Sequence, residues 1–195
     1  MSERDDLEYM LKATREGDYA RVVERGAAVL ASGADPSSII MLYADAFEEL
    51  GRTSEARDAF TLALTILPAA RHRRVLDALA ALELHAGAFV AAEAYCHRAI
   101  ALAPDHASAY IYLGIVYDRT DRVADAELQL ARATDCSEGA IDEAWYNLGG
   151  VQLKLGCTSE AESSLRRALA IDPDYELALE ALASLEDDRD PLTHS

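Results

Sequence analysis

Apolar residues recur at intervals of three and four along most of the chain, which is the spacing of one face of an α-helix. The pattern is clearest at residues 142–173, where one apolar stripe precedes Gly156 and a second follows it. Pro173 stands where continuing the second helix would cost about 3 kcal/mol. This stretch therefore predicts two antiparallel helices joined by a tight turn.

The two-helix pattern recurs upstream at near-constant spacing. Residues suited to a turn are separated by 34, 36, 34 and 35 positions, at Gly17, Gly51, Gly87, Asp121 and Gly156. A period of this length is typical of repeat architectures. Five repeats are predicted, near residues 3–36, 37–72, 73–106, 107–141 and 142–175.

The ends of the array differ from its middle. The first repeat is the most degenerate, as a terminal repeat facing water can be. Residues 176–188 have the stripe of a first helix without a second, which predicts a capping helix that closes a repeat domain of residues 1–188. Residues 189–195 are expected to be disordered. Ser37 or Ser38, after Pro36, is the expected N-cap of the second repeat.

The fifth repeat carries the most complete motif, formed by Trp145, Leu148-Gly149, Ala161, Leu165, Ala168 and Pro173. It resembles the tetratricopeptide repeat, whose pattern is W-x2-L-G…A-x3-F…P. Departures include Gln152 and Glu83 in the tyrosine place and Asp6 in the tryptophan place. The resemblance implies an all-α, right-handed superhelical α-solenoid of antiparallel helix pairs. Its concave wall would come from the first helix of each pair, and Trp145 is expected in the core.

Composition narrows the partners. Eighteen Lys and Arg against 35 Asp and Glu give a formal net charge of -17, which disfavours nucleic acid and anionic membranes. The start of the sequence lacks a signal-peptide pattern, and no later apolar run approaches a membrane span of about 18 residues. We therefore expect a cytoplasmic protein without membrane insertion. Three cysteines without C-x-x-C spacing predict reduced thiols.

No catalytic or metal-binding pattern stands out. Nucleotide-binding, nucleophile-elbow and zinc-protease motifs are missing from the sequence, and the carboxylates are spread as solvated helix faces. The five histidines show no i, i+4 pairing. We therefore expect a protein that is not an enzyme and has no cofactor or metal. A basic cluster at Arg71–Arg74 fits either ion pairing with nearby carboxylates or an anionic contact.

The inner face of the first helices is more apolar than a solvated helix needs, and acidic residues rim it. Such a groove is typical of a peptide-binding surface. The predicted groove residues are Leu7, Leu11, Met41, Asp45, Asp77, Ala81, Ile111, Tyr112, Ile115, Tyr146 and Asn147. The alternative is that neighbouring helices cover some of these side chains.

Three functions remain open. The first is a non-catalytic adaptor or scaffold that binds a partner protein or peptide, for example a basic-amphipathic one, in the groove. The second is a dedicated chaperone of a secreted or assembly-prone client, like the bacterial secretion chaperones built from such repeats. The third is a self-assembling structural module. The sequence leaves the oligomeric state undetermined.

Overall fold

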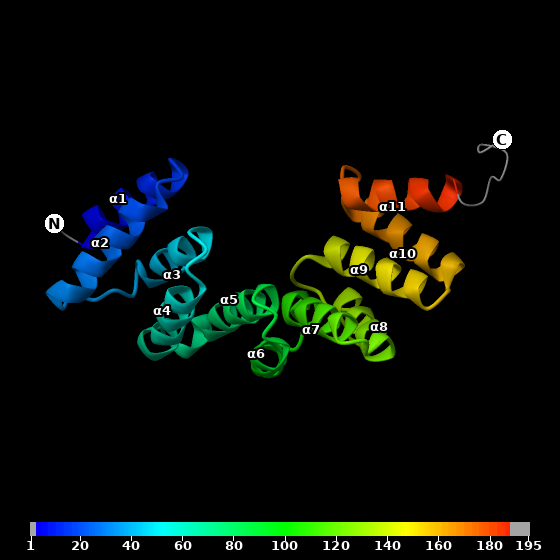
Figure 1. Cartoon of the computed structure of the whole chain (residues 1–195), viewed down its shortest axis with the longest axis horizontal. Coiled ribbons are helices and arrows are strands. Elements are labelled where there is room, and N and C mark those ends of the chain that lie inside the picture. The colour runs from blue at the N-terminus through cyan, green and yellow to red at the C-terminus, as the bar shows by residue number, and fades with distance from the viewer. Residues whose placement is uncertain (1–2, 188–195) are drawn as a thin grey trace. The chain divides into compact units, whose positions relative to one another are not determined.

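The computed structural model describes residues 3–187, which form α-helices joined by short turns (Figure 1). The helices are α1 Glu3–Arg15, α2 Tyr19–Ser32, α3 Ile40–Glu49, α4 Thr53–Ile66, α5 His72–His85, α6 Phe89–Leu102, α7 Ala107–Arg119, α8 Val123–Thr134, α9 Ile141–Lys154, α10 Thr158–Ile171 and α11 Glu176–Asp187. A short 3-10 helix, η1, covers Ala69–Arg71. The all-α prediction is confirmed for this part of the chain. Residue 188 of the predicted capping helix and the predicted tail 189–195 lie outside the described residues.

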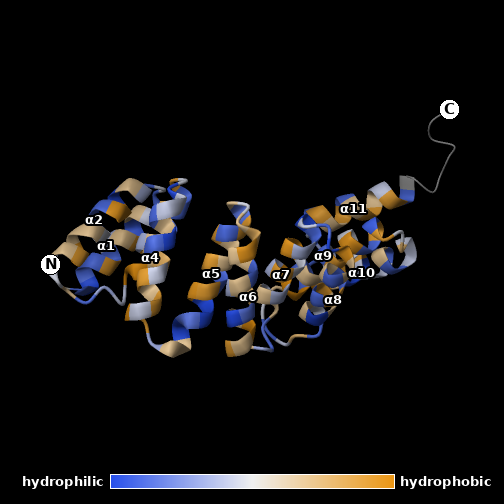
Figure 2. Ribbon diagram, turned by 60° about the horizontal axis from the view of Figure 1, so that its bottom comes forward, coloured by the Kyte–Doolittle hydropathy of each residue, from blue (hydrophilic) through white to orange (hydrophobic). Residues whose placement is uncertain are grey.

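The described residues divide into two compact units, an N-terminal unit of residues 3–88 and a C-terminal unit of residues 89–187. In the N-terminal unit α1 packs on α2, α2 on α3, α3 on α4, and α4 on α5. In the C-terminal unit α9 packs on α7, α8 and α10, and α10 also packs on α11. Apolar and polar residues alternate around the helices, so each helix has one face suited to packing (Figure 2). The division falls between α5 and α6, inside the third predicted repeat.

The turn within each predicted repeat has one hydrogen-bonding scheme. After α9, the N–H of Gly156 donates to the Leu153 carbonyl at 3.0 Å and that of Cys157 to the Gln152 carbonyl at 2.9 Å. This pair of bonds is the Schellman motif, which requires a left-handed backbone at its turn residue, and Gly156 has φ +77°. Asp121 takes the same place after α7 with φ +59°, a conformation that aspartate tolerates better than most residues. The spacing of these turn residues thus has a direct backbone cause.

Close approach of paired helices depends on small residues that face large ones. A Cβ on Gly149 would lie 3.0 Å from Leu165 Cγ, and a Cβ on Gly114 would lie 2.6 Å from Leu130 Cγ. Leu165 and Leu130 are each 1% exposed. The glycine of the motif therefore gives space to the large residue of the partner helix, as in dense protein interiors.

Neighbouring glycines in α9 should respond oppositely to substitution. Gly150→Ala is expected to raise the free energy of unfolding by about 0.5–1 kcal/mol, because glycine is a poor helix former and nothing lies within 4 Å of an added Cβ. Gly149→Ala meets Leu165 and the Ala161 carbonyl oxygen at 3.0–3.3 Å, and is expected to destabilise despite the same propensity gain. Urea denaturation of both variants measures the difference, and equal shifts would show that Leu165 does not press on Gly149.

Two sequence predictions about local structure need correction. The N-cap of α3 is Ile39, without a side-chain cap, rather than Ser37 or Ser38. The hydroxyl and the N–H of Ser37 instead donate to Asp35 Oδ1 at 2.6 and 2.9 Å, and the N–H groups of Ile39 and Ile40 donate to the Pro36 carbonyl. An additional turn therefore precedes α3, which begins at Ile40.

Trp145 is only partly buried. It packs at the margin of the cluster that contains Leu165, Ala168, Ala178 and Leu185. The guanidinium of Arg167 lies 4.9 Å from its ring centroid, a cation–π arrangement. Trp145 thus joins α9 to α10 but stands at the edge of the core that the motif predicted.

Two carboxylates that stand where the repeat motif has an aromatic residue are buried in ion pairs. Glu83, in the tyrosine place, is 2% exposed and accepts from Arg57 of α4, with Arg57 Nη2 at 2.9 Å from Oε2. Asp6, in the tryptophan place, is 7% exposed and pairs with Arg25 of α2. An arginine from a neighbouring helix thus compensates for burial of each charge.

Candidate functional site

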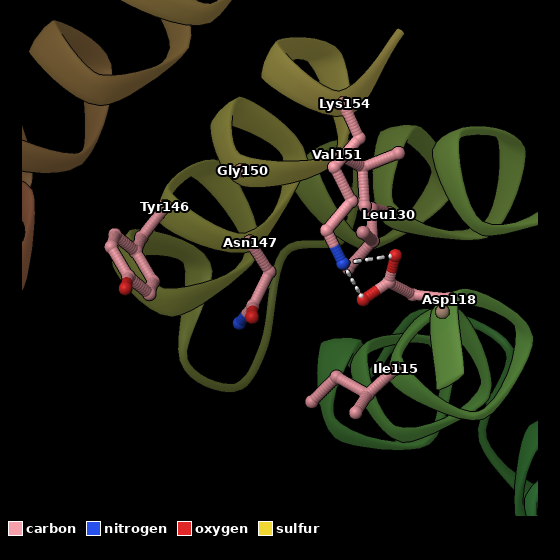
Figure 3. A pocket seen from close by; sticks show the side chains of 9 residues that line it. Ile115, Asp118, Leu130, Tyr146, Asn147, Gly150, Val151 and Lys154 are labelled. Atoms are coloured by element: carbon pink, nitrogen blue, oxygen red, sulfur yellow. Dashed lines mark hydrogen bonds and ion pairs between the residues drawn. The ribbon is translucent and has the colours of Figure 1, made fainter. Parts of the chain in front are cut away.

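A recess of about 130 Å³ lies between α7 and α9 of the C-terminal unit (Figure 3). Three predicted groove residues, Ile115, Tyr146 and Asn147, line it. The remaining lining comes from Gly114, Asp118, Leu130, Gly150, Val151 and Lys154. The structure therefore brings part of the predicted groove together in one place.

Two of the residues that line the recess, Gly114 and Gly150, have no side chain to fill it. Gly150 is exposed at the middle of α9, and an added Cβ there would meet no atom within 4 Å. Leu130 forms part of the wall next to Gly114. Open space above a helix backbone allows a ligand side chain to approach closely.

An ion pair joins α7 and α9 at the recess. Lys154 Nζ donates to both carboxylate oxygens of Asp118 at 2.7 and 2.6 Å (Figure 3). The Asp118 side chain is 17% exposed and that of Lys154 is 57% exposed, so the pair is open to water on the lysine side. The pair therefore links the two helices, but its contribution to the stability of the fold is small because it is solvated.

The surface near the start of α9 is aromatic and acidic. The rings of Tyr146 and Tyr175 lie 5.2 Å apart between centroids, and Tyr175 directly precedes α11. Burial, and to a smaller extent the negative charge of Asp142, raises the pKa of the Glu143 carboxyl above its ordinary value. Burial, and to a smaller extent the negative charge of Glu143, raises the pKa of the Tyr175 phenol to about 12. The Asn147 amide donates to the Glu143 carbonyl at 2.9 Å, which orients its carboxamide.

The prediction that Ile111 faces an open groove is wrong. Ile111 is 1% exposed and belongs to a core cluster with Ala107, Ala133 and Ala144. Ala144 lies on α9, so the following helix pair covers this side chain. Tyr112, one residue later, is half-buried. The exposed surface of α7 therefore does not coincide with the residues predicted to line the groove.

The N-terminal unit holds the other predicted groove residues in separate surroundings. Asp77 is only 9% exposed and accepts from Arg73, so it is not an open groove residue. This contact also gives one member of the Arg71–Arg74 cluster a carboxylate partner. Leu7 packs against the α1–α3 core. The remaining predicted residues are half-buried, namely Leu11, Met41, Asp45 and Ala81.

A second recess, of about 390 Å³, lies in the N-terminal unit beside Asp45. Its lining is Thr14, Tyr19, Leu42, Asp45, Ala46, Glu48 and Glu49. Burial, with Glu48 and Glu49 adding to it and Arg74 opposing it, raises the pKa of Asp45 to about 6. The ionised form of this carboxyl is therefore unfavourable in the folded state.

The raised pKa of Asp45 predicts a pH-dependent stability. A carboxyl that holds its proton more tightly when folded makes unfolding easier as pH rises from 3.8 to about 6. Asp45→Asn is expected to raise the melting temperature at about pH 7.5, with a gain that shrinks on acidification through this window. Thermal melts of both proteins across pH measure it. A gain that is constant with pH would show that ionisation of Asp45 does not lower the stability.

Sequence reasoning missed Asp118, Lys154, Gly150 and Tyr175. The second glycine of the Gly149-Gly150 doublet was the available signal, because the motif explains only the first. Asp118 and Lys154 are 36 positions apart, about one repeat. In the sequence each resembles an ordinary charged residue on a solvated helix face. Tyr175 lies at the end of the fifth predicted repeat, in the connection between α10 and α11, where no helical period applies.

Other chemistry is limited in residues 3–187. No group of three or more His, Cys, Asp or Glu in this part of the chain could hold a metal ion. Every helix described is too short or too polar to cross a bilayer. Cys96 is buried, whereas Cys136 and Cys157 are partly exposed free thiols.

A curated human relative aligns with most of this chain but with little of its own length. Protein O-mannosyl-transferase TMTC3 from Homo sapiens is 27% identical over 147 residues, which cover 68% of this chain and 16% of that protein. The chain therefore spans about a sixth of this relative.

Solved structures reproduce the fold. MamA 41-end from Desulfovibrio magneticus RS-1 has a TM-score of 0.73 at 16% identity, over 90% of this chain and 98% of that one. YrrB, described as a TPR protein with an unusual peptide-binding site, has a TM-score of 0.64 at 19% identity, over 90% and 89%. At these identities the likeness shows the fold alone, and it confirms the helical repeat solenoid class.

Family models agree with the repeat assignment. Residues 83–140 and 142–175 each match a model described as tetratricopeptide repeat. The helix pairs, the Schellman turns and the glycine-to-leucine contacts give these matches a structural basis. The chain therefore contains tetratricopeptide repeats within residues 83–140 and 142–175.

Proposed function

We propose that this protein is a non-catalytic interaction module that binds a segment of a partner protein on the α7–α9 face of its C-terminal unit. The observation that carries the proposal is the recess over Gly150, with Ile115 and Tyr146 on its walls. A partly apolar hollow with a few oriented polar groups suits one anchoring side chain of a polypeptide. Asn147 and the Asp118–Lys154 pair supply the polar groups.

Charge favours a basic-amphipathic segment. The formal net charge is -17, and Asp142 and Glu143 lie beside the aromatic end of the face. Such a surface attracts cationic ligands and makes their association sensitive to salt. A bound Lys or Arg close to Glu143 would also favour the ionised carboxylate, whose formation burial now opposes.

Comparisons support the class of function. Tetratricopeptide repeats serve generally in protein–protein interaction, and one structural neighbour has a peptide-binding site by its own description. The human transferase is a much longer protein than the part of it that aligns with this chain. We therefore infer no transferase activity, and the cytoplasmic location remains a prediction.

A peptide library tests the proposal without knowledge of the natural partner. Random peptides displayed on phage are selected on the full chain, and individual binders are then measured against Gly150→Phe. That side chain should occupy the recess and reduce affinity at least about tenfold, which corresponds to 1.4 kcal/mol. We expect the selected peptides to combine Lys or Arg with a large apolar residue.

Two controls make the selection decisive. Gly150→Ala leaves the recess open, and Ser163→Phe places the same ring on an exposed position of α10. Both should bind the selected peptides as the unaltered chain does. Peptides that bind Gly150→Phe undiminished, or a selection that enriches nothing, would overturn the assignment of this face.

The chaperone and self-assembly alternatives predict other observations. A dedicated chaperone would co-purify with one stoichiometric client that is insoluble alone. A self-assembling module would show concentration-dependent mass in sedimentation. Neither observation is expected if the α7–α9 face is a general peptide-binding site.

A further inference from the structure

Helix α11 continues the repeat register of α9. Residues 34 positions apart correspond, so Leu179 follows Trp145, Leu182 follows Leu148, Ala183 follows Gly149 and Glu186 follows Gln152. We call the four α11 residues, Leu179, Leu182, Ala183 and Glu186, the terminal face. Their counterparts on α9 show what this face is built to contact.

The α9 counterparts face the second helix of their own pair. Trp145 lies under the guanidinium of Arg167, Gly149 approaches Leu165, and Gln152 Oε1 accepts from the Ser164 hydroxyl at 2.7 Å. Arg167, Leu165 and Ser164 all belong to α10. These positions therefore form the contact between a first helix and a second helix.

On α11 three of these four positions are open. Leu179 is 47% exposed, and Ala183 and Glu186 are exposed, whereas Leu182 is half-buried and packs at the edge of the cluster formed with α10. A different side of the helix, with Ala178 and Leu185, packs into the cluster formed with α10. A helix that needed only to cap the array would be expected to carry polar residues at the three open positions.

We propose that the terminal face docks an amphipathic helix of a partner protein, which takes the place of the second helix of a sixth pair. The internal pairs specify the shape of this occupant. In α10 and α8, a small residue is followed four positions later by leucine, as Ala161 with Leu165 and Ala126 with Leu130. The leucine in each case lies against the glycine to which Ala183 corresponds. The second and third repeats have buried alanines, Ala44 and Ala80, in that place, so an alanine there is compatible with a packed second helix. The docked helix therefore carries Ala-x3-Leu on its contact face.

The charge of the terminal face specifies a basic occupant. Glu186 corresponds to Gln152, whose side-chain oxygen accepts from Ser164 of the second helix in its own pair. Glu176 and Glu180 are also exposed on α11. An Arg or Lys at the position equivalent to Ser164 would meet Glu186, so the occupant is a helix with Ala-x3-Leu and a basic residue between them.

The test uses a peptide taken from the chain's own α10. The probe is Thr158–Ile171 with Ser164→Arg, labelled with a fluorophore and held helical by a lactam on its outer side, because isolated helices of this length are marginal. Fluorescence anisotropy measures its binding to the full chain. We expect saturable binding that weakens as salt is added.

Two equally exposed leucines provide the matched variants. Leu179→Glu should weaken binding at least about tenfold. Leu177→Glu, at a position 50% exposed but outside the terminal face, should change it less than about twofold. Both sites are exposed, so both variants are expected to melt like the unaltered chain. Gly150→Phe should also leave this binding unchanged, which separates the terminal face from the α7–α9 face.

Each contrary outcome overturns the docking proposal. Absence of saturable binding, or equal binding by Leu179→Glu, would remove the terminal face as a helix site. Loss of binding in Gly150→Phe or in Leu177→Glu alone would assign the peptide elsewhere. Self-association of the chain that Leu179→Glu abolishes would show that a second copy, rather than a partner helix, covers this face.

Discussion

Leu130→Ala is expected to lower the free energy of unfolding by about 2–5 kcal/mol, the range for large-to-small changes in a well-packed core. Leu130 is 1% exposed and lies against the glycine of the facing helix, where a Cβ on Gly114 would come within 2.6 Å of its Cγ. Removing the isobutyl group leaves a cavity between α7 and α8. Urea denaturation followed by circular dichroism measures the loss.

A second substitution tests whether the loss comes from this contact. Gly114→Ala alone should destabilise, because the new methyl group collides with Leu130. In the Leu130→Ala background the same methyl group enters the cavity, so the double variant should be more stable than the sum of the two single effects predicts. Additive effects would mean that the two residues are not packed against each other.

Arg57→Ala is expected to destabilise the N-terminal unit by about 3 kcal/mol, because it leaves a buried carboxylate without its principal cation. Glu83 is 2% exposed, whereas the Arg57 side chain is 39% exposed. Water can reach the vacated arginine position, which places the expected effect at the lower end of the usual range for broken buried pairs. Chemical denaturation at neutral pH measures it.

Removing both charges should restore most of the lost stability. Arg57→Ala combined with Glu83→Leu leaves no charge at either position, and a well-packed apolar replacement of an ion pair is often neutral or stabilising. Arg4→Ala serves as a control, because its pair with Glu8 is solvated. If Arg57→Ala is no more harmful than Arg4→Ala, the buried ion pair does not stabilise the fold.

The helix pairs could be predicted because their determinants are local. The Schellman turn needs a residue that tolerates positive φ, and Gly156 or Asp121 supplies it at a fixed distance from the preceding stripe. The glycine that faces Leu165 is likewise part of a short motif. In contrast, the start of α3 depends on a competition between Ser37 capping and its bonds to Asp35, which residue type alone does not decide.

The candidate site was predicted only in part because its exposure depends on the next repeat. Ile111 and Tyr146 occupy equivalent positions 35 residues apart in the sequence. Ala144 and its neighbours in α9 bury Ile111, whereas Tyr146 meets Tyr175 just before α11 and stays half-open. A single-helix pattern contains no information on such covering.

Backbone amide chemical-shift mapping of the full chain with a library-selected peptide tests the proposed function most directly. If the peptide lies on the α7–α9 face, the largest shifts will fall at Ile115, Tyr146, Asn147 and Gly150, and Gly150→Phe will abolish them. Shifts confined to α8 and α10 would contradict a partner-binding role for this face.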